Sequence, residues 1–160
     1  IKNPELISTS SKRFGSQCIV VAIDAREITA PSKAKSLIPE VAIDSQSKWE
    51  VYTHGGRYPA GIDALKWAKY MEHLGAGEIL LTSMNHDGTK AGYAIELTKT
   101  ISNSVQIPVI ASGGAGTVEH IVEALQVCEA ALLASLLHYG ELTISEIKQA
   151  CNQANIPMRK

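Results

Sequence analysis

A strand, a turn and a helix follow one another in the run Pro108-Val109-Ile110-Ala111-Ser112-Gly113-Gly114-Ala115-Gly116 and the segment 117–127 behind it. The stretch 108–112 has the length and the β-branched residues of a strand. Glycines then keep side chains out of the turn, and the apolar spacing of 117–127 is that of a helix. The run therefore indicates one βα unit with a glycine-rich turn at the carboxyl end of its strand.

The same alternation extends in both directions from this unit. Short apolar runs predict strands at residues 17–24, 78–83, 108–112 and 130–135. Apolar spacing and capping signals predict helices at residues 61–74, 93–104, 117–127 and 143–155. The first strand is an unbroken β-branched run that ends in Asp24, as is typical of a parallel strand buried on both faces. We therefore expect an α/β fold with four parallel strands and outer helices.

Two further segments complete the predicted order of elements. The chain opens on a helix, because Asn3 can cap it, Pro4 suits its first position and Gly15 can stop it. Roughly residues 25–53 form a long excursion over the strand ends, in which 41–43 and 49–53 flank a turn like a hairpin. The expected chain is thus a leading helix followed by four βα units.

Composition restricts the kind of partner. The 160 residues are 45% hydrophobic and 19% charged, which suits one globular domain, and the net charge of −1 gives no broad surface for nucleic acid or a membrane. No apolar run approaches the length of a membrane span. The cysteines, Cys18, Cys128 and Cys151, are odd in number and are expected to be small buried hydrophobes in a reducing cytoplasm. The histidines lack metal-ligand spacing, so neither a metal nor a cofactor is implied.

The number of predicted strands is informative. A closed (β/α)8 barrel needs about eight strands and typically about 250 residues, so residues 1–160 would supply half of one barrel domain. Four strands alone would leave two sheet edges unpaired and would expose an apolar face that lies inside a whole barrel. The sequence is therefore expected to be partial or to need a partner.

Two adjacent strand ends have the composition of a phosphate site. Gly113 and Gly114 let backbone N–H groups approach an anion, and Thr117 begins a helix whose positive end points the same way. Ala134 and Ser135 would close the cradle from the next strand. In barrels, phosphate frequently binds the loops after the last two strands, although glycines alone could merely make tight turns.

Several motifs occur in the order found in one known family. They are Phe14-Gly15-Ser16-Gln17, Val20-Val21-Ala22-Ile23-Asp24, Trp49-Glu50-Val51-Tyr52-Thr53-His54-Gly55-Gly56-Arg57, Gly75-Ala76-Gly77-Glu78-Ile79-Leu80-Leu81-Thr82-Ser83-Met84, Asp87-Gly88-Thr89-Lys90 and Ile110-Ala111-Ser112-Gly113-Gly114-Ala115-Gly116. With them the chain resembles the cyclase subunit of imidazole glycerol phosphate synthase, from histidine biosynthesis. The likeness covers nearly the whole chain except roughly 27–47 and aligns with that family's C-terminal half. The related phosphoribosyl isomerase barrel shares the Asp-Gly-Thr and Gly-Gly turns but fits Gly92-Tyr93 less well.

The resemblance implies a lyase that takes ammonia from a glutaminase subunit, its partner in a heterodimer. The ammonia converts a bis-phosphorylated formimino-ribulosyl aminoimidazole carboxamide nucleotide to imidazole glycerol phosphate and an aminoimidazole carboxamide ribotide. Asp24 corresponds to one of the family's two acid/base aspartates, and the other lies on a strand outside this sequence. A partly buried carboxylate at this position could exchange protons near neutral pH. The alternative is that Asp24 only hydrogen-bonds loop N–H groups.

The resemblance also assigns binding residues. Asp87 and Gly88 match the family's phosphate-binding turn, and Thr82 is expected to contact substrate. Asn85 and His86 stand where many relatives carry Asp and Arg, so a charge role there does not transfer. Two functions remain open at this point. The chain is either a portion of the cyclase, or a non-catalytic half-barrel that binds phosphate and pairs with a missing N-terminal half or a second copy.

Overall fold

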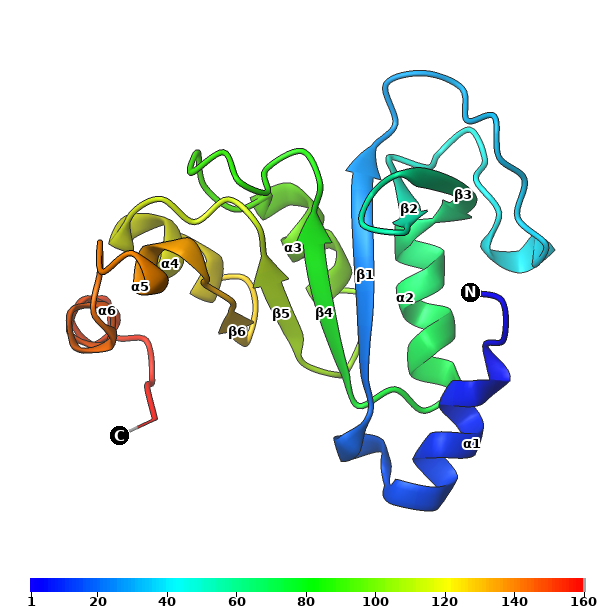
Figure 1. The fold of residues 1–160 in the computed structure, drawn as a ribbon. Coiled ribbons are helices and arrows are strands. Elements are labelled where there is room, and N and C mark those ends of the chain that lie inside the picture. Colours follow the sequence, from blue (N-terminus) through cyan, green and yellow to red (C-terminus); the bar gives the residue numbers. More distant parts are fainter. Residues whose placement is uncertain (160) are drawn as a thin grey trace.

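Six strands form one sheet, in the order β3-β2-β1-β4-β5-β6, in the computed structural model, which describes residues 1–159 (Figure 1). The strands are β1 (Val20–Glu27), β2 (Trp49–Thr53), β3 (Tyr58–Asp63), β4 (Glu78–Ser83), β5 (Val109–Ser112) and β6 (Ala130–Ala131). β1, β4, β5 and β6 are parallel, as predicted, whereas β2 and β3 are antiparallel to their neighbours. The expectation of four strands alone was therefore wrong, because a hairpin extends the sheet beyond β1.

Six α-helices accompany the sheet within residues 1–159. They are α1 (Glu5–Phe14), α2 (Ala64–His73), α3 (Ile95–Ser102), α4 (Val118–Leu125), α5 (Ser135–His138) and α6 (Ile144–Gln153), with 3₁₀ turns η1 (Ser16–Cys18) and η2 (Pro39–Val41). The predicted capping box of Thr143 and Glu146 is confirmed at the start of α6. Asn3 was wrongly expected to cap α1: the N-cap position is Pro4, without a side-chain cap. Gly15 ends α1 with φ 90°, as predicted.

The region after Asp24 differs most from the prediction. β1 does not end at Asp24 but continues to Glu27, because its last residues pair with β2. β2 was expected to pair with 41–43, but its hairpin partner is β3. Residues His54, Gly55 and Gly56 have positive φ values of 56°, 64° and 76°, and this left-handed turn reverses the chain directly after β2. Gly61 and Ile62 thus belong to a strand, and α2 begins only at Ala64.

The last strand is shorter than expected. The prediction gave 130–135, whereas β6 contains only Ala130–Ala131 and Ser135 already begins α5. A side chain holds this short strand against its neighbour: a Glu129 carboxylate oxygen accepts a hydrogen bond of 2.9 Å from the Val109 backbone N–H. Because β6 is short, Ala134 lies at the N-cap of α5 and Ser135 at its first position, outside the strand.

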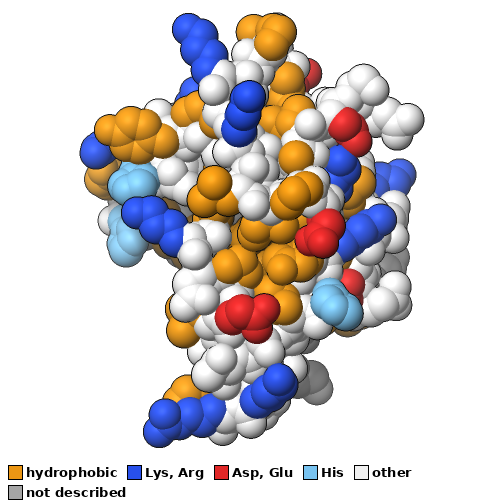
Figure 2. Space-filling model, turned by 90° about the vertical axis from the view of Figure 1, so that its right-hand side faces the viewer, with side chains coloured by type: hydrophobic (Ala, Val, Ile, Leu, Met, Phe, Trp, Pro, Cys, Tyr) orange, Lys and Arg blue, Asp and Glu red, His pale blue; other side chains and the backbone are white. Residues whose placement is uncertain are grey.

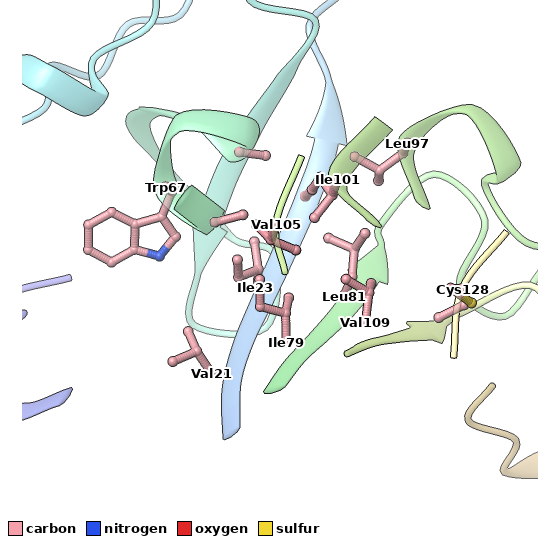
Figure 3. Packing of buried hydrophobic residues seen from close by; sticks show 14 of the residues in the cluster. Val21, Ile23, Trp67, Ile79, Leu81, Leu97, Ile101, Val105, Val109 and Cys128 are labelled. Atoms are coloured by element: carbon pink, nitrogen blue, oxygen red, sulfur yellow. The ribbon is translucent and has the colours of Figure 1, made fainter. Parts of the chain in front are cut away.

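Only one face of the sheet is well covered. In β1, Val21, Ile23 and Ala25 are buried, whereas Val20 on the opposite face is 49% exposed. Burial of β1 on both faces was therefore a wrong expectation. Figure 3 shows the core on the covered face, where strand side chains meet those of the helices; it labels Val21, Ile23, Ile79, Leu81, Val109, Trp67, Leu97 and Ile101. The opposite face, here called the open face, carries the alternate residues of the same strands.

The leading helix is also sparsely packed. α1 contains no buried residue, and Leu6 and Phe14 on it are 59% and 58% exposed. Figure 2 shows the side of the molecule that carries α1, α2 and the excursion, with hydrophobic side chains gathered at its centre between scattered charged groups. Leu6 and Phe14 are thus large apolar side chains on a mostly polar helix that no other element of residues 1–159 buries.

The burial of the cysteines agrees with the prediction at two of the three positions. Cys128 and Cys151 are buried as predicted, but Cys18 is exposed, because it lies in the turn η1 between α1 and β1. Among the helices of residues 1–159, none combines the length and the apolar character needed to cross a membrane.

Candidate functional site

A row of polar side chains crosses the open face near the carboxyl ends of three parallel strands. The register pairs Asp24 of β1 with Thr82 of β4, and Thr82 with Ser112 of β5. Residues in register on neighbouring parallel strands point to the same side, so the three side chains lie next to one another. Tyr52 of β2 continues the row, because it is paired with Asp24 on the other side. All four are half-buried.

The acid at one end of this row has an altered proton affinity. Partial burial raises the pKa of Asp24 above its ordinary value, and the nearby carboxylate of Asp87 raises it further. Both causes disfavour the charged form of the carboxyl group. A carboxyl group with a raised pKa exchanges protons closer to neutral pH than an ordinary aspartate does. Asp24 therefore has the electrostatic setting of an acid/base group.

A cavity of about 230 Å³ lies beside the row, between the turns that follow β4, β5 and β6. Its lining contains six of the residues expected to bind phosphate: Asp87, Gly88, Gly113, Gly114, Ala134 and Ser135. The turns of three strands thus converge on one hollow, although these residues lie in three separate segments of the chain. Thr82 lies outside the cavity lining and belongs to the polar row.

Close backbone contacts between two turns give the cavity its shape. The Gly92 N–H donates to the Gly114 carbonyl oxygen at 2.8 Å, and a Cβ atom on Gly114 would collide with the Gly92 carbonyl. Gly114 also has φ 108°, which L side chains rarely adopt. Here glycine is required for close approach as well as for backbone conformation. The two turns therefore form one interlocked unit, which we call the cradle (residues 86–92 and 113–116).

Side chains for which the sequence predicted no structural role hold the cradle in place. His86 Nδ1 is hydrogen-bonded to the Gly92 carbonyl oxygen at 2.7 Å, and Tyr93 Oη donates to the Leu132 carbonyl oxygen at 2.9 Å. Burial raises the pKa of Tyr93 to about 12, so its hydroxyl stays protonated and remains a donor at neutral pH. Asn85 Oδ1 accepts from the Glu27 N–H at 2.9 Å and thereby connects the ends of β4 and β1. Asn85 and His86 thus have structural roles.

Two polar residues of the cavity lining were not among the predicted site residues. Ser112 lines the cavity and also belongs to the polar row, and Lys90 lines the cavity from the turn after β4. Counting register from the strand ends would have found Ser112, because it is the last residue of β5. Lys90 is recognisable only from tertiary structure. Within residues 1–159, no cluster of three or more His, Cys, Asp or Glu side chains could hold a metal ion.

The fold and the site together define an α/β protein whose polar groups and glycine-rich turns collect at the carboxyl ends of parallel strands. Comparison with known proteins gives the particular family. The model of the family described as "Histidine biosynthesis protein" matches residues 1–143, and the chain belongs to this family.

Individual relatives agree with this assignment. The chain is similar to imidazole glycerol phosphate synthase subunit HisF from Synechococcus sp., with 56% identity over 99% of the chain, and from Trichormus variabilis, with 54% identity over 99% of the chain. The same subunit from Bacillus cereus is 50% identical over 99% of the chain. The chain spans 58% of the length of these relatives.

Proposed function

We propose that this chain contributes the catalytic Asp24 and one phosphate site to the cyclase reaction of imidazole glycerol phosphate synthase. One observation carries the proposal: Asp24, Thr82 and Ser112 form a row on the open face, directly beside a cavity lined by Asp87 and the glycines of the cradle. A proton-exchanging group and an anion-sized hollow are thus adjacent. The likeness to HisF proteins supports the choice of reaction.

The geometry assigns separate tasks to the two parts of the site. One phosphate of the bis-phosphorylated substrate would lie in the cavity, where Gly88, Gly113, Gly114, Ala134 and Ser135 surround it. This anchor would place the reacting atoms over the open face, within reach of Asp24 and Thr82. Asp24, whose pKa is raised, would then exchange a proton as ammonia from a glutaminase subunit attacks.

The open face supports the proposal that residues 1–160 are the C-terminal half of one (β/α)8 barrel. The excursion, expected at about 25–53, comprises residues 28–48, because 25–27 belong to β1 and 49–53 to β2. Val20 on the open face is 49% exposed, and the edge strand β6 has a neighbour on one side only. In a closed barrel both features would be covered by the other strands, and α1 would pack beside the strand that precedes it. We propose that the other half of the barrel, which carries the second acid/base aspartate, supplies these strands. The free thiols suit a cytoplasmic setting.

A second candidate is a phosphate-binding half-barrel that catalyses nothing and pairs with a second copy through the open face. The exposed apolar residues of the open face and α1 favour it. In this case phosphate would bind and the chain would form a cooperative dimer, which size-exclusion chromatography with light scattering would detect.

The test is an Asp24→Asn variant in a barrel completed with the remaining segment of the Synechococcus relative. We expect ammonia-dependent cyclisation to fall sharply while substrate still binds, because the amide cannot exchange a proton but preserves the shape of the site. Ser45→Ala, in the excursion, is the matched control and should leave the rate unchanged. A rate unaffected by Asp24→Asn would remove Asp24 from the mechanism, and loss of binding would show that it acts in binding instead.

A further inference from the structure

Lys90 occupies an unusual position at the edge of the cradle. Its φ is 57°, a left-handed conformation that a residue with a side chain adopts at a cost. The contact with the next turn explains why it is held there: a Cβ atom on Gly116 would collide with the Lys90 carbonyl, so the two backbones are packed against each other. The backbone of Lys90 is thus fixed by the same interlocking that shapes the cavity.

Charge in the cavity is unevenly distributed. Asp87 contributes a carboxylate to the lining, and among the lining residues, all of which the structure describes, Lys90 is the one cation. A phosphate group that enters therefore meets a fixed negative charge. Backbone N–H groups can bind the anion, but Lys90 is the side chain that can balance its charge.

The Lys90 ammonium is already occupied by another anion. Its Nζ donates to both carboxylate oxygens of Glu141, at 2.6 and 2.7 Å. Glu141 belongs to the loop that follows α5, and its N–H donates to the carbonyl oxygen of Leu136, a residue of the cavity lining. The carboxylate of Glu141 therefore stands at the cavity edge, where it serves as the counter-ion of Lys90.

This ion pair can be exchanged easily. The side chains of Lys90 and Glu141 are 46% and 41% exposed, and ion pairs in contact with water contribute little to stability. A phosphate dianion carries more charge than a carboxylate and offers three acceptor oxygens. Exchange of one partner for the other needs only rotation of the flexible lysine side chain, because its backbone is fixed.

We propose that Lys90 is a phosphate ligand whose ammonium is held by Glu141 in the empty site and transfers to the phosphate when substrate binds. The inference rests on the proposed phosphate site and adds a cation to it, the Lys90 ammonium, whose availability depends on Glu141. Glu141 then has a defined role as a competitor of the ligand: it keeps Lys90 ordered beside the cavity and lowers the affinity of small anions that could not displace it.

The experiment is calorimetric titration of the 160-residue chain with inorganic phosphate. Binding should be about tenfold weaker in Lys90→Gln, which loses a charge-assisted hydrogen bond, and about threefold tighter in Glu141→Gln, which loses the competitor. The double variant should bind like Lys90→Gln alone, because Glu141 acts through Lys90. Thermal melts of each variant establish that it is folded.

The matched control is Glu96→Gln. Glu96 forms an ion pair of 2.6 Å with Lys48, and the two side chains are 70% and 65% exposed, respectively. Both lie outside the cavity lining, so the variant removes the same charge without touching the site. It should leave phosphate affinity unchanged. If the unaltered chain does not bind phosphate, the proposed function fails. If the chain binds phosphate but Lys90→Gln binds equally well, or Glu141→Gln tightens binding in the Lys90→Gln background too, the inference about Lys90 is wrong.

Discussion

The loops at the carboxyl ends of the strands are held together in two different ways. The cradle after β4 and β5 is interlocked by backbone contacts at its glycines, so that two turns share one surface, and the His86 side chain supports this contact at the Gly92 carbonyl oxygen. The excursion after β1 also packs its backbone against a glycine, Gly61, but a buried side chain anchors it: the carboxylate of Glu50 accepts from Ser32 Oγ at 2.7 Å and from the Gly61 N–H at 2.8 Å. Backbone interlocking leaves N–H groups free of side chains, which suits an anion site, whereas side-chain anchoring only positions a loop.

The strongest test of this difference is Gly114→Ala. The new Cβ would collide with the Gly92 carbonyl and would have to adopt φ 108°, so we expect a loss of about 3 kcal/mol in the free energy of unfolding. Phosphate binding should be lost as well. The control is Gly55→Ala, where φ is 64° and no atom lies within 4 Å of the added Cβ, so only the backbone cost of about 1 kcal/mol remains. Urea unfolding measures the stability of both variants. Equal losses of stability in Gly114→Ala and Gly55→Ala would show that the interlocking of the two turns is unimportant.

Glu50→Ala tests the other kind of anchoring. The Gly61 N–H would lose its acceptor, and we expect the free energy of unfolding to fall by about 2 kcal/mol. Glu50→Gln keeps an acceptor oxygen, so its free energy of unfolding should fall by less. Because Glu50 lies outside the cradle, the affinity for phosphate, measured by calorimetry, should stay unchanged in both variants. A weakened affinity would mean that the two regions are coupled.

Asp24→Asn should have a smaller effect, and in the opposite direction. The folded-state pKa of Asp24 is raised, so its contribution to stability is fully present below the unfolded pKa and is lost as pH rises through the folded pKa. At pH 7 the variant should be slightly more stable than the unaltered chain, because the neutral amide places no charge in the half-buried site, and solvent screening keeps this gain small. The gain should vanish below about pH 3.8. Thermal melts across this range would contradict the account if the gain persisted in acid.

The smallest effect is expected for Asp44→Asn in the excursion. The hydrogen bond from Lys66, at 2.6 Å, holds the pKa of Asp44 at about 2. Because this pKa is lowered, the stabilisation is present above the ordinary value of 3.8 and disappears as pH falls through about 2. Asp44→Asn should therefore lower the Tm slightly at pH 7 and leave it unchanged near pH 2. A difference that is independent of pH would exclude the ion pair as its cause.

The sequence predicted elements best where one pattern had one interpretation. The bounds of β4 agree with the predicted 78–83, because a continuous apolar run there lies between polar turns. Gly61 and Ile62 were assigned to a helix because their spacing also fits helical periodicity, and only pairing with β2 makes them a strand. The turn at residues 54–56 was missed although the Gly55-Gly56 dipeptide is a turn signal, and only the positive φ of His54 left no trace in the composition.

The candidate site, like the fold, could be predicted from the sequence only in part. Asp24 could be found because it closes the apolar part of β1, and Gly113 and Gly114 because they follow β5. Parallel strands bring these positions to one edge of the sheet. The pairing of Lys90 with Glu141 and the contact between Gly92 and Gly114 could not be found. Both depend on how two loops from distant parts of the sequence pack against each other, which local patterns do not encode.

The central claim, that the cradle and the turn after β6 form an anion site, can be measured directly by following backbone amides in ¹H–¹⁵N NMR spectra during a phosphate titration. The account predicts saturable shifts at Gly88, Gly113, Gly114 and Ser135, with no change at Gly55 on the β2–β3 turn. Unchanged resonances at the four cradle and turn positions, or larger saturable shifts elsewhere in the chain, would contradict it.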